Sequence, residues 1–98
     1  MIQIIALLYA SNNGLKGLRE FESKAIPILK EHGGVLVSAS SNKNRSSTAP
    51  DEIHVIQFPS MKAFEAYQND KRIIALGALK ETMISKMEVH ITDSFHEY

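Results

Sequence analysis

The first strand-like segment of the chain has no polar face. Its residues, Ile2 to Tyr9, are apolar at odd and even positions alike, apart from Gln3. Neighbouring residues on a strand point to opposite sides of a sheet, so an antiparallel sheet with one solvated side alternates apolar and polar residues. Both sides of this strand must therefore be covered. Helices of the same chain can cover one side, and a second copy of this 98-residue chain is the simplest cover for the other.

The next segments predict a helix followed by a strand. Apolar residues between Leu15 and Leu29 recur with a helical period. Pro27 lies inside this run and should kink or restart the helix, because proline lacks a backbone donor and crowds the preceding turn. The pair Gly33-Gly34 is typical of a helix C-terminus. Val35 to Ala39 then predicts a second strand.

The second half of the chain repeats the alternation of strand and helix with a split helical region. Proline, serine, asparagine and aspartate mark its breaks, as they commonly do. The expected elements are a hairpin loop at Ser40–Pro50, a strand at Glu52–Phe58, a helix capped by Ser60, a break at Asn69-Asp70, a second helix with Ile73, Leu76, Leu79 and Met83 inward, a strand at Lys86–Thr92, and a polar-aromatic tail at Asp93–Tyr98.

The order of these elements predicts an α+β fold. It is β-α-β-β-α-β, the ferredoxin-like arrangement, in which an antiparallel four-stranded sheet carries its helices on one face. The other face stays bare in a monomer, and soluble monomers rarely expose so large an apolar surface. We therefore expect a single domain over residues 1–98 that forms a homodimer through the open sheet face, because a two-fold dimer uses the same patch twice.

Composition excludes several classes of partner and chemistry. Eleven basic residues balance eleven acidic ones, so nucleic-acid binding lacks its usual electrostatic drive. The chain contains no cysteine, which excludes disulfides, a thiolate nucleophile and cysteine-ligated zinc, and which fits a cytoplasmic protein. No apolar run approaches the roughly 20 residues of a membrane span. The apolar start lacks a basic leading segment and is interpreted as a strand rather than a signal peptide.

Two stretches resemble a known family. One is the helix, glycine pair and strand from Ala25 to Val37, and the other is the strand-Phe-Pro-Ser-helix segment from Asp51 to Tyr67. Together they resemble the DUF1330-like branch of the dimeric α/β-barrel superfamily. The resemblance implies a homodimer whose two four-stranded sheets face each other as a barrel. That superfamily includes cofactor-free monooxygenases, haem enzymes, lactone isomerases and many members without a known reaction.

Histidines and tyrosines are the candidate site residues. His54 lies in the middle of an expected central strand, where it is either a base in an apolar pocket or a core histidine with a hydrogen-bond partner. His90, on the last strand, is either solvated, at a dimer interface or close to a pocket. Tyr9 and Tyr67 combine an apolar ring with a hydroxyl and either line a pocket or pack in the core. His32, at a helix end, and His96, in the tail, are expected to be structural or solvated.

The sequence leaves two functions open. One is a dimeric binding protein without catalysis that accommodates a small apolar or aromatic molecule beside His54, Tyr9, Tyr67 and His90. The other is a cofactor-independent, monooxygenase- or isomerase-like enzyme with a pocket between sheet and helices. No cofactor or metal is expected, since His54, Glu88 and His90 could act as ligands only if their faces agree, and no closely spaced histidine pair occurs. A cavity beside His54 favours a ligand-binding role, and a sealed core disfavours it.

Overall fold

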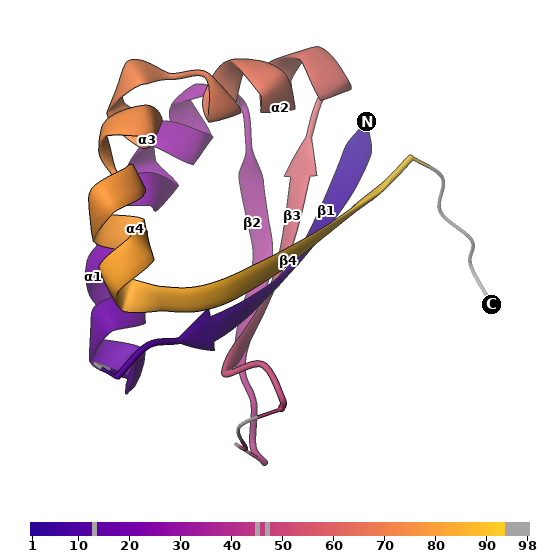
Figure 1. Ribbon diagram of the computed structural model, residues 1–98. Helices are drawn as coiled ribbons and strands as arrows, with labels where there is room; N and C mark the ends of the chain where they lie inside the picture. Colours follow the sequence, from indigo (N-terminus) through magenta and orange to yellow (C-terminus); the bar gives the residue numbers. More distant parts are fainter. Residues whose placement is uncertain (13, 45, 47, 94–98) are drawn as a thin grey trace, which may run out of the picture.

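A computed structural model of the chain describes residues 1–12, 14–44, 46 and 48–93 (Figure 1). Residues 13, 45, 47 and 94–98, and with them His96 and most of the expected tail, lie outside this description. One four-stranded sheet is packed against the helices, with the strand order β2-β3-β1-β4. The elements are β1 (Ile2–Ala10), α1 (Gly14–Glu31), β2 (Val35–Ser41), β3 (Glu52–Phe58), α2 (Met61–Gln68), α3 (Lys71–Ala75), α4 (Gly77–Met83) and β4 (Ile84–Thr92).

The antiparallel register of the sheet decides which residues face the helices. β1 is central, pairing Ala6 with His54 on β3 and with Val89 on β4. On β1 and β3 burial alternates strictly, so that Ile4, Ala6 and His54 are buried while their neighbours are only half-buried. The sheet therefore has one face that the helices cover over its central strands and one open face, as the ferredoxin-like order predicts.

The helices cover the buried face and form a core with the two central strands (Figure 1). The larger core cluster brings β1, β3, α1 and α2 together through Ile4, Leu29, Phe58 and Phe64. Phe58 and Phe64 pack with their ring centroids 5.3 Å apart. A second cluster joins the other end of β1 to α1 around Leu18, which is completely buried. Residues of both clusters line the cavity described below.

The glycine pair ends α1 in a Schellman motif. The amides of Gly33 and Gly34 donate to the carbonyl oxygens of Lys30 and Leu29, each at 3.0 Å. Gly33 has φ +82°, a left-handed conformation that favours glycine. The expected restart at Pro27 is wrong, because α1 continues through it as one helix. Pro27 is exposed, so the carbonyl that it leaves without an amide partner lies near solvent.

The second helical region is more divided than the sequence predicts. Ser60 caps α2 by accepting a hydrogen bond from the amide of Ala63, and Asp70 caps α3 by accepting one from the amide of Arg72. The expected second helix is interrupted at Leu76, which separates α3 from α4. Strand bounds also differ from the prediction. β2 continues through Ser41 into the expected loop, and β4 begins at Ile84 because backbone pairing with β1 does not need apolar side chains.

The open face of the sheet has an apolar centre and polar margins. Half-buried Ile5, Leu7, Ile53 and Val55 occupy the middle of β1 and β3. The register places β4 side chains Lys86, Glu88, His90 and Thr92 beside β1 residues of this face. Among the described residues, no helix is both long and apolar enough to cross a membrane.

Candidate functional site

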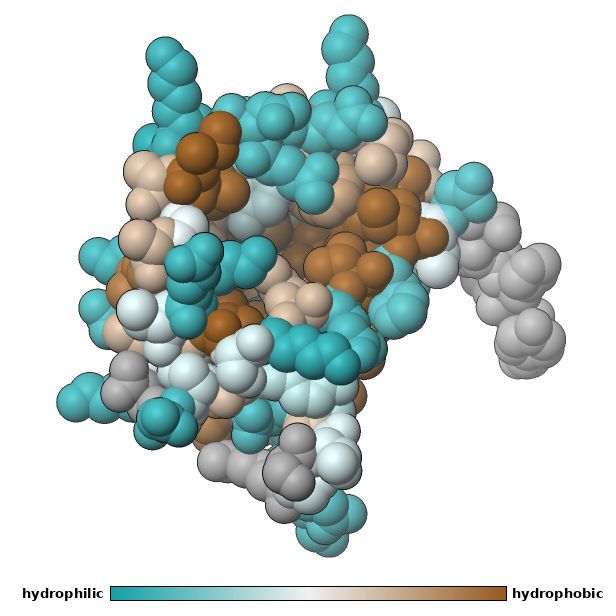
Figure 2. Space-filling model, viewed as in Figure 1, coloured by the Kyte–Doolittle hydropathy of each residue, from teal (hydrophilic) through white to brown (hydrophobic). Residues whose placement is uncertain are grey.

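A cavity lies between the covered face of the sheet and the helices. Its volume is about 380 Å³, within the range of small-molecule sites, which begins near 300 Å³. In the space-filling view, apolar side chains surround a hollow between α2 and β4 (Figure 2). The lining is mainly apolar and comes from both the sheet and the helices: Ile4, Ala6, Leu8, Phe21, Ala25, Ile26, Leu29, Leu36, Ile56, Phe58, Phe64, Ile73, Ile74, Gly77, Met87 and Val89, with Glu22, His54, Tyr67, Gln68 and Lys80 as its polar members.

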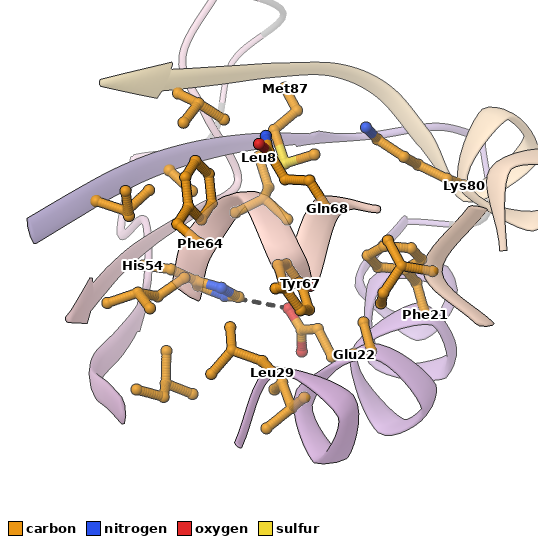
Figure 3. Close-up of a pocket in the computed structure, with 18 of the residues that line it drawn as sticks. Leu8, Phe21, Glu22, Leu29, His54, Phe64, Tyr67, Gln68, Lys80 and Met87 are labelled. Atoms are coloured by element: carbon orange, nitrogen blue, oxygen red, sulfur yellow. Dashed lines mark ion pairs between the residues drawn. The ribbon is translucent and has the colours of Figure 1, made fainter. Parts of the chain in front are cut away.

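An imidazole and two carboxylates meet at the wall of this cavity. His54 and Glu52 lie two residues apart on β3 and therefore share a face of the strand. Figure 3 shows Glu22 of α1 beside His54. Nε2 of His54 is 2.6 Å from Oε1 of Glu52 and 3.2 Å from Oε2 of Glu22. All three residues are buried, with residue exposures of 6% for His54, 1% for Glu52 and 9% for Glu22.

Arg19 holds the other oxygen of each carboxylate. Its Nη1 donates to Oε1 of Glu22 at 3.0 Å and to Oε2 of Glu52 in a shorter contact. Arg19 is one turn before Glu22 on α1, and its side chain is half-exposed. Each carboxylate therefore has one oxygen bound to the guanidinium and one directed at the imidazole. This division fixes the orientation of both carboxylates.

The mutual contacts of the cluster shift its protonation equilibria. Burial acts to raise the pKa of Glu22, but the hydrogen bonds and charges of His54, Glu52 and Arg19 together outweigh it and lower that pKa to about 2. Burial acts to lower the pKa of His54, and the adjacent carboxylates of Glu22 and Glu52 reverse this and raise it. These shifts favour an ionised Glu22 and extend upward the pH range in which His54 is protonated.

Tyr67 is the second predicted residue that lines the cavity. Its ring packs between core and cavity, 5.7 Å from the Phe58 ring and 6.5 Å from the Phe64 ring. Burial raises the pKa of the Tyr67 phenol, which therefore stays protonated. The hydroxyl makes no hydrogen bond within the part of the chain that the structure describes. It is therefore a donor and acceptor at the cavity wall that the described residues leave unused.

The structure does not bring Tyr9 and His90 to this cavity. Tyr9 pairs with Lys86 and His90 pairs with Ile5, and both side chains belong to the open face of the sheet. Tyr9 is half-buried there beneath Lys86, whose Nζ is 5.1 Å from the ring centroid. His90 is exposed, 3.9 Å from the carboxylate of Glu88. Of the predicted site residues, His54 and Tyr67 lie at the cavity. The glutamates that contact His54, Glu22 and Glu52, were not predicted from the sequence as site residues.

The profile of a family described as a domain of unknown function, DUF1330, matches residues 5–98. The chain belongs to the DUF1330 family. The family has no assigned activity, and no curated protein matches the sequence.

Solved structures share the fold of this DUF1330 protein at low sequence identity. A protein of unknown function from Rhodopseudomonas palustris superposes with a TM-score of 0.80 at 12% identity, over 98% of this chain and 83% of that one. A protein from Nitrosomonas europaea, provisionally assigned as an antibiotic biosynthesis monooxygenase, gives 0.72 at 10% identity, over 98% and 100%. A dimeric ferredoxin-like protein of unknown function from Bacteroides fragilis gives 0.66 at 12%, over 95% of each chain. These likenesses establish the ferredoxin-like fold.

Proposed function

We propose that this DUF1330 protein is a single-domain homodimer that binds a small apolar or aromatic molecule in the cavity between its sheet and helices. The observation that supports the proposal is the composition of the cavity wall. Most of it is aliphatic and aromatic, and its five polar members include the phenol of Tyr67 and the imidazole of His54. Ligand sites commonly combine an apolar enclosure with a few polar groups that fix the orientation of the ligand.

The polar groups suggest how such a ligand is oriented. The Tyr67 hydroxyl has no partner in the described part of the chain, so a hydroxyl or carbonyl on the ligand gains a hydrogen bond there. Among the described residues, His54 contacts both carboxylates through Nε2, so Nδ1 is left for a polar atom of the ligand. The ring of the ligand then packs against Phe64, Leu29 and their neighbours.

The dimer is proposed on the open face of the sheet. Ile5, Leu7, Ile53 and Val55 form its apolar centre, and burying them against a second copy removes apolar area from water at roughly 25 cal/mol per Å². The structural neighbour from Bacteroides fragilis is dimeric, which supports the same assembly here. In that arrangement Tyr9 and the exposed His90 belong to the interface rather than to the ligand site. A cytoplasmic location is part of this proposal and is supported by the lack of cysteines.

A cavity-filling substitution tests the binding site. Ala25 on α1 is buried and lines the cavity, so Ala25→Leu places extra methyl groups inside it. Naphthalene and 2-naphthol, whose ring fluorescence reports on burial, serve as probes. We expect a saturable fluorescence change with wild-type protein, a loss of at least about ten-fold in affinity for Ala25→Leu, and stronger binding of 2-naphthol than of naphthalene.

The matched control is Ala66→Leu, the same change at an exposed position of α2 that does not line the cavity. It should bind both probes as the wild type does. Failure of both probes to saturate the wild type, or equal binding by Ala25→Leu in a folded state, would refute the ligand site. Tyr67→Phe should abolish the preference for 2-naphthol and leave naphthalene binding unchanged.

Acid–base catalysis is the second candidate function. The specific observation in its favour is the imidazole of His54 held between the carboxylates of Glu22 and Glu52 beside an apolar cavity, a setting typical of proton transfer. The fold neighbour assigned provisionally to monooxygenases supports it. Incubation of a bound probe in D₂O with air decides between the two: deuterium incorporation or oxygen uptake that His54→Gln abolishes indicates catalysis. An unaltered probe leaves binding as the function.

A further inference from the structure

We infer that Glu22, Glu52 and His54 form a binding site for a divalent transition-metal cation at the wall of the cavity. One ligand atom from each residue, Nε2 of His54 and a carboxylate oxygen of each glutamate, lies within 4.8 Å of the other two. This inference does not depend on the proposed binding of an aromatic molecule, since the three residues converge whether or not the cavity is filled.

The donor set suits such an ion in type and in spacing. Imidazole with carboxylates is a common environment for zinc, manganese, iron and cobalt, at bond lengths of about 2.0–2.2 Å. Two ligand atoms at that distance from one ion lie about 3.0–3.4 Å from each other when the angle between their bonds ranges from the octahedral to the tetrahedral value. The separation of His54 Nε2 from Glu22 Oε2 is already 3.2 Å. The 2.6 Å separation of Nε2 from Glu52 Oε1 needs to open by only a few tenths of an ångström.

An unsatisfied atom independently indicates a missing partner. Among the described residues, buried Oε2 of Glu22 has no hydrogen bond of regular geometry, and its contact is the ion pair with Nε2 of His54 at 3.2 Å. A buried carboxylate oxygen that is incompletely hydrogen-bonded costs free energy, because the water removed from it is only partly replaced. A cation placed between Glu22, Glu52 and His54 supplies the partner that this oxygen lacks.

Arg19 provides the outer support that a metal site requires. Metal-binding carboxylates are commonly oriented by hydrogen bonds to their other oxygen, and Nη1 of Arg19 makes such a contact with each glutamate. Two ionised carboxylates and one guanidinium leave a net negative charge around a neutral imidazole, which favours a cation. Three protein ligands also leave a coordination position open, and both Glu22 and His54 line the cavity.

The test is a titration of the full-length protein with Zn²⁺ after removal of metal by EDTA and dialysis, followed by calorimetry. We expect one ion per protomer. Glu22→Gln keeps the size of the side chain and should weaken binding at least about ten-fold, as should His54→Gln. The control is His32→Gln, which removes a histidine whose Nε2 lies 2.8 Å from Oδ2 of Asp70. This variant should bind Zn²⁺ as the wild type does.

A second measurement needs no substitution. Co²⁺ added to the wild type should broaden the NMR signals of the His54 imidazole before those of His32 and His90. The inference is overturned by the absence of stoichiometric binding, by binding that folded Glu22→Gln and His54→Gln retain, or by earlier broadening of a surface histidine. Neither experiment uses an aromatic probe, so a failure of metal binding leaves the proposed binding of an aromatic molecule unaffected. A failure of the aromatic probes to bind likewise leaves the metal site unaffected.

Discussion

Replacing Glu22 by Gln should change how the stability of the protein depends on pH. The pKa of Glu22 is 4.5 in an unperturbed carboxyl and about 2 in the folded protein. At about 1.4 kcal/mol for each pH unit, this difference corresponds to roughly 3 kcal/mol of stability near neutral pH. Because the folded pKa is the lower one, that stability is present above pH 4.5 and is lost as the pH falls toward 2.

His54 acts in the opposite direction. Its pKa is raised above 6.5 in the folded protein by Glu22 and Glu52, against the effect of burial. Its contribution is therefore fully present below pH 6.5 and is lost as the pH rises through the folded pKa. The charged groups that face it are Glu22 and Arg19 from α1 and Glu52 from its own strand. Together these shifts predict that the free energy of unfolding is largest between about pH 4.5 and 6.5.

Urea denaturation followed by circular dichroism measures this effect. It should be carried out with EDTA, at one protein concentration, and at pH values from 3 to 8, with the slope checked for constancy. Glu22→Gln should cost roughly 3 kcal/mol near pH 6 and less than half of that near pH 3, because at pH 3 the carboxyl of the unfolded chain, with its pKa near 4.5, is already protonated. The exposed Glu20→Gln on the same helix should change stability by less than about 0.5 kcal/mol. A cost for Glu22→Gln that is equal at pH 3 and pH 6 would contradict the electrostatic reasoning.

Further substitutions test the assembly and the helix ends. Leu7→Glu and Val55→Glu place a charge at the apolar centre of the open face and should each give monomers in sedimentation velocity; an intact dimer in both would remove the interface. Gly33→Ala should lower stability by about 1–2 kcal/mol, because φ is +82° and the new Cβ would lie 3.2 Å from a proline ring. In Gly77→Ala the new Cβ, in a helix, would have no atom within 4 Å, and stability should rise by up to about 1 kcal/mol. Thermal melts compare the two glycine variants. Ser60→Ala removes the hydroxyl that caps α2 by accepting a hydrogen bond from the amide of Ala63 at 3.1 Å. The substitution should lower stability by about 1 kcal/mol in the same melts.

Local chemistry explains why so much of the fold could be predicted. Strand period, a glycine pair and two capping residues are signals carried by adjacent residues. They placed the strands to within two residues at each end, and they placed the end of α1 and the starts of α2 and α3. The helix restart expected at Pro27 does not occur, because the effect of an internal proline depends on its solvent exposure, which is a property of the packed structure. The interruption at Leu76 carries no proline and no side-chain cap, so sequence pattern offered no signal for it.

The site was harder to predict because both sheet faces are apolar. His54 and Tyr67 were found from their positions in a strand and a helix. Which alternate strand residues face the helices, as His54 does, and which face away, as Tyr9 and His90 do, becomes clear only once the covered face is known. Two signals for the remaining residues were present. Glu52 lies two residues before His54 and must share its face, and Glu22 lies four residues after Leu18, inside the apolar stripe of its helix.

Stability alone does not account for the charged cluster at the cavity wall. Buried ion pairs can often be replaced by apolar side chains without loss, because removing the charges from water offsets their attraction. An aliphatic residue at position 22 would continue the buried stripe of Leu18 and Leu29 and would fill part of the cavity. The chain instead leaves the space open and places two carboxylates and an imidazole beside it. An unfilled cavity lowers stability, and a buried charge cluster often stabilises less than apolar packing at the same place would. Their occurrence side by side supports the proposed ligand, which would use both.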